Sequence, residues 1–152
     1  MKKIVYIIYL AIGTKAFGQT TPRTAKSPTE CIPAGYVLAE EIRGDLNHDN
    51  QADYVLIIKA TDKNKFVKDE YRGQLDRNRR GIIIAFKNKD QYELMLENRG
   101  CFSSENEDGG VYFAPELNVS INKGNLLVNY AHGRYGYWSY NFRYQNADFE
   151  LI

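Results

Sequence analysis

Short β-branched and aromatic runs, separated by polar turn residues, limit what this chain can fold into. Residues 54–59 (YVLIIK) and 81–87 (GIIIAFK) are continuous apolar runs of strand length, as expected for strands buried on both faces. Residues 116–122 alternate apolar and polar side chains, which is the period-two pattern of a half-buried strand. The sequence therefore predicts an all-β, or β-dominated, domain.

Turn residues divide much of the remaining chain into strand-sized pieces. The Asn88-Lys89-Asp90 turn predicts a hairpin, and Lys123-Gly124-Asn125 predicts another. We expect a single antiparallel β-meander of about seven strands, or a small open barrel. The charge-dense connection 60–80 fits a short amphipathic helix or a long solvated loop equally well. The other expected strands cover residues 34–42, 91–97, 126–132, 137–145 and 149–152.

The first residues predict export. Met1-Lys2-Lys3, the apolar run 4–13 and the small-x-small sequence before Gln19 are typical of a signal peptide at 1–18. The alternative is a buried first strand. Residues 19–30 carry no large apolar side chain, so we expect a flexible leader. The mature protein is then periplasmic or secreted, with no membrane span.

The mature chain is expected to form one β domain over residues 31–152. The length of 152 residues and the 43% apolar content of the full chain suit one core. Loss of three lysines with the signal changes the net charge from +1 to −2, which gives no electrostatic case for nucleic acid. The chain ends within an apolar strand, which indicates a lightly packed or C-terminally truncated end.

The chain has two cysteines, Cys31 and Cys101. Both follow the signal peptide, in a compartment where disulfides persist. An even pair predicts one bridge, which would add about 4 kcal/mol by the loop-entropy model.

An acidic stretch between the first two strands has the form D-x-N-x-D-x-x-x-D. Oxygen donors at this spacing can wrap a loop around a hard cation such as Ca²⁺. The expected ligands are the side chains of Asp45, Asn47, Asp49 and Asp53 with the carbonyl of Gln51. The alternative is a metal-free turn held by Asx side chains.

At these residues the chain resembles the calcium loops of FG-GAP repeats, in which a strand follows the ninth-position aspartate as Tyr54-Val55-Leu56 does here. Asn50 stands where these loops usually have glycine, and asparagine is the residue best able to replace glycine in a left-handed turn. One copy of the motif is visible, whereas a propeller needs several.

A wider resemblance covers residues 44–152. The stretches GDLNHDNQADYVLIIK, DRNRRGIIIAFKN, CFSSENEDGGVYFAPEL and HGRYGYWSYNFRYQNADFELI are similar to a family of uncharacterised exported bacterial proteins, often from Bacteroidetes, with an FG-GAP-like loop. This resemblance implies no activity.

The residues leave three functional hypotheses open. The first is a calcium-stabilised binding module for a protein or glycan ligand, with a weak surface at His132, Arg134, Tyr135 and Tyr137. The aromatic row Trp138, Tyr140, Phe142 and Tyr144 beside it is assigned to core packing. The alternative is a hydrolase that combines Glu105, Glu107 and Asp108 with His132. The third is a purely structural remnant of a longer protein.

Overall fold

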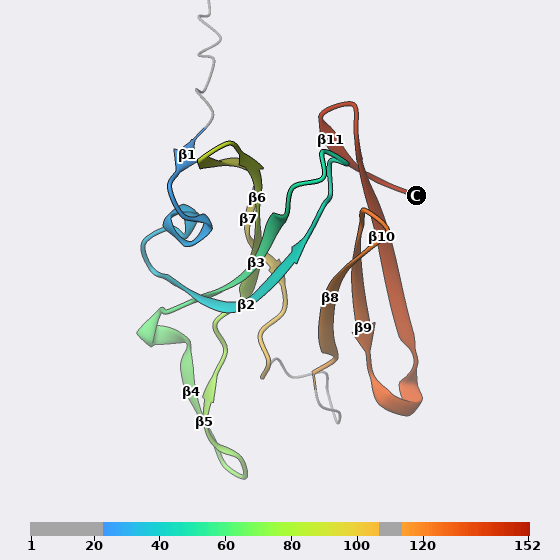
Figure 1. Ribbon diagram of the computed structural model, residues 1–152. Coiled ribbons are helices and arrows are strands. Elements are labelled where there is room, and N and C mark those ends of the chain that lie inside the picture. The colour runs from blue at the N-terminus through green and yellow to red at the C-terminus, as the bar shows by residue number, and fades with distance from the viewer. Residues whose placement is uncertain (1–22, 107–113) are drawn as a thin grey trace, which may run out of the picture.

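The protein is a β-sandwich in this computed structural model, which describes residues 23–106 and 114–152. The all-β prediction is confirmed, with most strands divided between two antiparallel sheets and the remaining two forming a separate hairpin (Figure 1). The five-stranded sheet has the order β1 (Thr24–Ala25), β7 (Gln91–Phe102), β6 (Arg80–Asn88), β3 (Asp53–Ala60), β2 (Tyr36–Gly44). The four-stranded sheet has the order β11 (Asp148–Leu151), β10 (Tyr137–Gln145), β9 (Asn125–Ala131), β8 (Glu116–Asn122). The predicted signal peptide lies outside the described residues.

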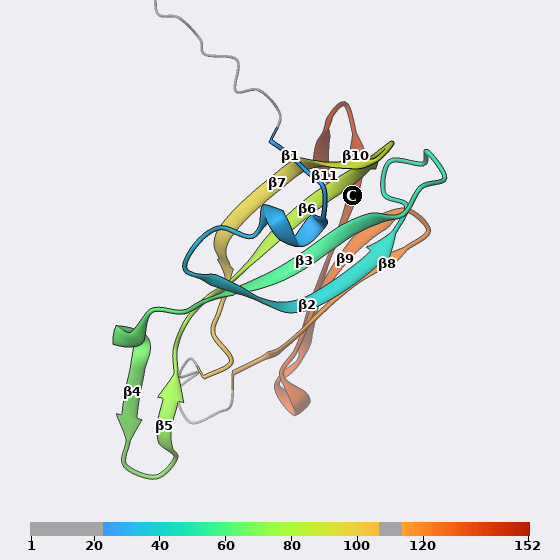
Figure 2. The same cartoon turned by 60° about the vertical axis from the view of Figure 1, so that its left-hand side comes forward.

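The two sheets meet along one side and separate along the other. The edge strands β2 and β8 lie side by side (Figures 1 and 2), and a Cβ on Gly44 would lie 2.8 Å from Cγ2 of Ile121. At the opposite edges, and among the described residues, β1 pairs with β7 at Tyr92 and Glu93, and β11 pairs with β10 from Phe142 onward. The space between the sheets is therefore closed at β2 and β8 and left open between β7 and β10.

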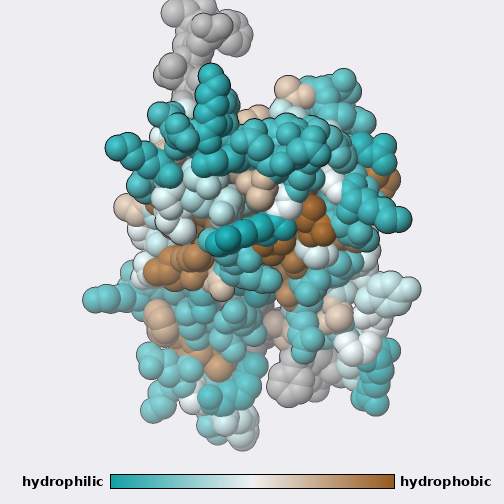
Figure 3. All heavy atoms as spheres, in the orientation of Figure 1, coloured by the Kyte–Doolittle hydropathy of each residue, from teal (hydrophilic) through white to brown (hydrophobic). Residues whose placement is uncertain are grey.

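Apolar side chains from both sheets form the core between them. The central strands β3 and β6 are buried along most of their length, as their continuous apolar runs predict. Figure 3 shows hydrophobic side chains across the middle of one face of the molecule, with hydrophilic side chains above them. The buried residues of this core are Leu46, Val55, Ile57, Ile82, Ile84, Phe86, Phe102, Val119, Leu126 and Val128.

The N-terminal segment covers the other face of the five-stranded sheet. Strand β1 and the 3₁₀ turn η1 (Pro28–Cys31) bring Cys31 onto a second buried cluster with Leu56, Ile58, Ile83 and Ala85. Order therefore begins before Cys31, earlier than the leader prediction placed it. Residues 24–30 have few apolar side chains, but hydrogen bonds to β7 and the buried Pro28 hold them on the sheet.

Neither expectation for residues 60–80 is correct. After the short turn η2 (Lys63–Lys65), β4 (Phe66–Asp69) and β5 (Gly73–Asp76) form a hairpin that extends away from the sandwich (Figures 1 and 2). Leu75 is buried, while Phe66 on the paired strand is 43% exposed. Because the hairpin buries so little apolar surface, its strands carry a weak sequence pattern.

The predicted disulfide is not formed, and both cysteines are free thiols. Ile82 and Ile84 of β6 point into the space between the sheets, where Cys101 also lies. Ile83 and Ala85 point to the opposite face, where Cys31 is buried. Because successive strand residues point to opposite faces, the sheet itself separates the two sulfur atoms.

The last strand is paired rather than isolated. β11 forms an antiparallel ladder with Phe142–Gln145 of β10, and Phe149 packs against the core. Leu151 and Ile152 remain 62% and 50% exposed, so the end of this strand is lightly packed, as expected. None of the helices among the described residues has the length and hydropathy needed to cross a bilayer.

Candidate functional site

The acidic turn between β2 and β3 is held by its own backbone amides. The carboxylate of Asp45 accepts hydrogen bonds from the amides of Asp49 at 3.2 Å and Asn50 at 2.9 Å. The Asn47 side chain accepts from the Asp49 amide, and Asp49 accepts from the Gln51 amide. Asn50 has a φ of 65°, so the left-handed conformation expected at this position is confirmed.

Asp53 has a different role from the other acidic residues. Its carboxylate is fully buried and accepts hydrogen bonds from the amides of Leu46 at 2.9 Å and Lys87 at 3.0 Å. Burial raises the pKa of Asp53 above its ordinary value, and the two amide hydrogen bonds partly oppose this increase. Asp53 therefore fastens the acidic turn to the end of β6.

The geometry of the turn gives limited support for a metal ion. Across residues 23–106 and 114–152, no three His, Cys, Asp or Glu side chains lie close enough together to hold one. The oxygens of Asp45, Asn47 and Asp49 retain further lone pairs beyond those that accept the amides, so ligation is chemically open to them. Calcium at this turn stays a prediction.

An open apolar cleft lies between the sheets on the side where their edges separate. Its volume is about 690 Å³, which falls in the range of about 300–1,000 Å³ typical of ligand sites. Its floor comes from Ile82 and Ile84 of β6 and Leu126 and Val128 of β9. Leu96 of β7 lines it on one side. This cleft is therefore large enough to hold a small-molecule ligand.

The aromatic row of β10 forms the other wall of this cleft. Trp138, Tyr140 and Phe142 line the cleft, and Trp138 stacks on Tyr130 with ring centroids 5.3 Å apart. Trp138 and Tyr140 are 40% and 44% exposed, whereas Tyr144 beyond them packs edge-on against Phe86 at 4.7 Å. The sequence predicted that these four residues share one face and pack in the core. Phe142 and Tyr144 do pack against the core, whereas Trp138 and Tyr140 remain partly exposed.

One end of the cleft carries a positively charged side chain. Arg79 lines the cleft, and its Nε donates a hydrogen bond to the carbonyl oxygen of Phe102 at 3.3 Å. Glu97 also lines the cleft, but it forms ion pairs with Arg99 and, at 3.9 Å, with Arg23. Among the residues that the structure describes, no carboxylate lies within ion-pair distance of Arg79.

The structure gives the predicted hydrolase residues other contacts. Glu105 forms ion pairs with Lys59 at 3.3 Å and Arg80 at 3.7 Å, which tie the chain after β7 to β3 and β6. Glu107 and Asp108 lie outside the described residues.

The predicted weak surface lies at the turn between β9 and β10. The rings of His132 and Tyr135 lie 5.5 Å apart, and the Arg134 guanidinium stands 5.1 Å from the centre of the Tyr135 ring. Tyr137 is 82% exposed on the outer face of β10, away from the cleft-lining row. The turn therefore gathers His132, Arg134 and Tyr135, while Tyr137 stands apart.

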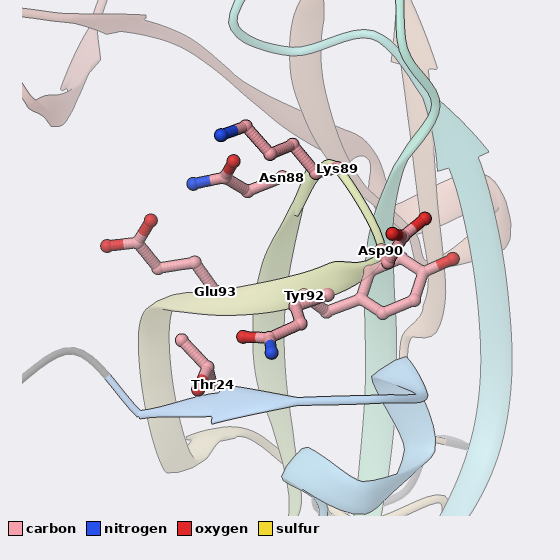
Figure 4. A pocket seen from close by; sticks show the side chains of 7 residues that line it. Thr24, Asn88, Lys89, Asp90, Tyr92 and Glu93 are labelled. Carbon is pink, nitrogen blue, oxygen red and sulfur yellow. The ribbon is translucent and has the colours of Figure 1, made fainter.

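A second, smaller hollow of about 330 Å³ lies at the turn between β6 and β7. In Figure 4 the side chains of Asn88, Lys89 and Glu93 point to one side and those of Asp90 and Tyr92 to the other. These polar groups do not converge on a common point. The cleft between the sheets is therefore the stronger candidate site.

Comparisons with models of protein families, with curated proteins and with solved structures give no match to this chain.

Proposed function

We propose that this protein is an exported, non-catalytic binding module whose ligand site is the cleft between its two sheets. One observation carries the proposal: aromatic and aliphatic side chains from β6, β7, β9 and β10 line a cleft of about 690 Å³ whose wall remains partly exposed. Exposed aromatic surface is unfavourable in water unless something covers it. A ligand with apolar surface would bury it.

The contacts across the sandwich explain how the cleft stays open. Phe86 and Tyr144 join the sheets at one end, and Phe102 and Tyr130 approach at the other with ring centroids 6.3 Å apart. Between these contacts the free edges of β7 and β10 lack a strand that would bring the sheets together, among the described residues. The cleft is therefore bounded at both ends and accessible from the side.

The single tryptophan of the chain allows a direct test. Trp138 lines the cleft, so an apolar ligand such as decanol should shift its fluorescence emission to shorter wavelength and saturate. Replacing Tyr140 by Ser removes aromatic surface from the wall and should weaken binding about tenfold. The measurement is a fluorescence titration below the solubility limit of decanol.

Tyr137→Ser is the matched control for this titration. Tyr137 lies on the same strand but points to the other face, so its loss should leave the affinity unchanged. A response that does not saturate in the wild-type protein would refute the binding site. Equal weakening by Tyr137→Ser and Tyr140→Ser would also refute it.

We further propose that calcium stabilises the turn from Asp45 to Asp53. The sequence spacing and the confirmed left-handed Asn50 support this proposal, while the amides of the turn already satisfy part of its oxygens. At a hundredfold excess over its Kd, Ca²⁺ should raise the melting temperature by about 5–10 °C relative to chelator. The Asp45→Ala variant should lose that shift, whereas equal melting of the wild-type protein with Ca²⁺ and with chelator would remove calcium from the proposal.

A further inference from the structure

We infer that the ligand of this cleft is a single-chain amphiphile with a carboxylate head group, held at the head by Arg79. This inference rests on the proposed function and adds the chemical class of the ligand. It combines three observations: the charge at one end of the cleft, the shape of its apolar part, and the apolar lining of its other end.

The charge of the cleft is positive at one end. Glu97 is neutralised by Arg99 and Arg23, which leaves the guanidinium of Arg79 as the uncompensated charge among the described lining residues. The hydrogen bond from its Nε to Phe102 fixes one edge of the guanidinium and leaves its terminal amino groups for a ligand. A planar guanidinium is well suited to a carboxylate because it can donate two parallel hydrogen bonds.

The apolar part of the cleft is elongated and begins beside Arg79. The cross-strand pairs Tyr130 with Trp138, Val128 with Tyr140, and Leu126 with Phe142 follow one another away from the charged end. From Trp138 to Phe142 the strand rises about 14 Å. This arrangement fits one extended alkyl chain with its head at Arg79.

Among the described residues that line the far end of the cleft, none is charged. Phe142 and Phe149 line it, and Phe149 lies 5.2 Å from Tyr144 between ring centroids. A second charged head group at this end would lose its hydration without gaining a partner. The cleft therefore favours a ligand with one anionic end and one apolar end.

A matched pair of probes tests the head group. Decanoate and decanol share the chain length but differ in charge, and we expect decanoate to bind about fivefold more tightly at low salt, as for an exposed ion pair. Arg79→Gln should abolish this preference. Trp138 fluorescence again reports the binding.

Arg143→Gln serves as the control variant. Arg143 lies on the outer face of β10, where its Nε contacts the Asn125 side chain, so its replacement changes the net charge equally without touching the cleft. It should preserve the preference for decanoate. High salt should reduce that preference in the wild-type protein because the pair is exposed.

The outcomes separate this inference from the proposed function. If decanol and decanoate bind equally to the wild-type protein, the anionic head group is refuted and the cleft stands as a binding site. Equal loss of preference in Arg79→Gln and Arg143→Gln would also refute the role of Arg79. If neither probe gives a saturable response, both the inference and the proposed function fail.

Discussion

Replacing Asp53 by Ala should lower the free energy of unfolding by about 3 kcal/mol, because it leaves two buried amides without their acceptor. These are the amides of Leu46 and Lys87, which bond the two oxygens of the carboxylate at 2.9 and 3.0 Å. The change would detach the acidic turn from β6 and leave a small void beside Leu46, which is fully buried. Urea unfolding at neutral pH measures the loss.

Two further variants show whether the effect belongs to the buried carboxylate. Asp49→Ala removes an exposed carboxylate of the same turn, which bonds only groups of the turn, and should cost less than about 1 kcal/mol. Asp53→Asn keeps one acceptor but places an amino group opposite the other amide, so its loss should be intermediate. Equal losses from Asp49→Ala and Asp53→Ala would contradict the structural role of Asp53.

The pH dependence of this effect has a defined sign. Burial raises the pKa of Asp53, so the folded protein binds more protons than the unfolded chain between the ordinary value and the raised value. The contribution of Asp53 to stability therefore falls as the pH rises through that window. The destabilisation by Asp53→Ala should be larger at mildly acidic pH than at neutral pH.

Gly81→Ala should destabilise the protein by about 3 kcal/mol and lower its melting temperature by about 6–12 °C. A Cβ at this position would lie 2.3 Å from the carbonyl oxygen of Asn98 and 2.7 Å from the carbonyl carbon of Arg99. Both are backbone atoms of β7, which cannot move without breaking its ladder with β6. The register of this ladder shifts between Arg80 and Ile82, so β7 approaches Gly81 at an irregularity of the pairing.

Gly100→Ala provides a control on the same pair of strands. A Cβ on Gly100 meets no atom within 4 Å, and its replacement should leave the melting temperature nearly unchanged. Calorimetry of both variants compares them under identical conditions. If Gly81→Ala melts like Gly100→Ala, β7 does not approach β6 as closely as the structure shows.

The sequence predicted most strands because their patterns are strong. Residues 54–59 and 81–87 became the central strands β3 and β6, since an unbroken apolar run of this length is stable only where both faces are covered. The left-handed Asn50 was also predictable from the intrinsic tolerance of asparagine for this conformation. Such features depend on a few neighbouring residues.

The errors occurred where distant segments decide the outcome. The hairpin β4–β5 has a weak pattern because it buries little, and its charged residues fit other structures equally well. The cysteine pairing failed because two cysteines in one chain carry no information about which face of a sheet each will occupy. The hydrogen bond from the Lys87 amide to Asp53 was not predicted, because the two residues lie 34 positions apart in sequence.

The candidate binding site also combines a feature that the sequence determined with one that only the tertiary structure decided. The alternation of residues 137–145 by itself determined that Trp138, Tyr140 and Phe142 share a face, because strand side chains have a period of two. Only the tertiary structure decided that this face borders an open cleft with Arg79 at one end. Burial of that face depends on how closely the five-stranded sheet approaches it. The distance between the sheets is set by the contacts of β2 with β8 and by Phe86, which lie far from residues 137–145 in the chain.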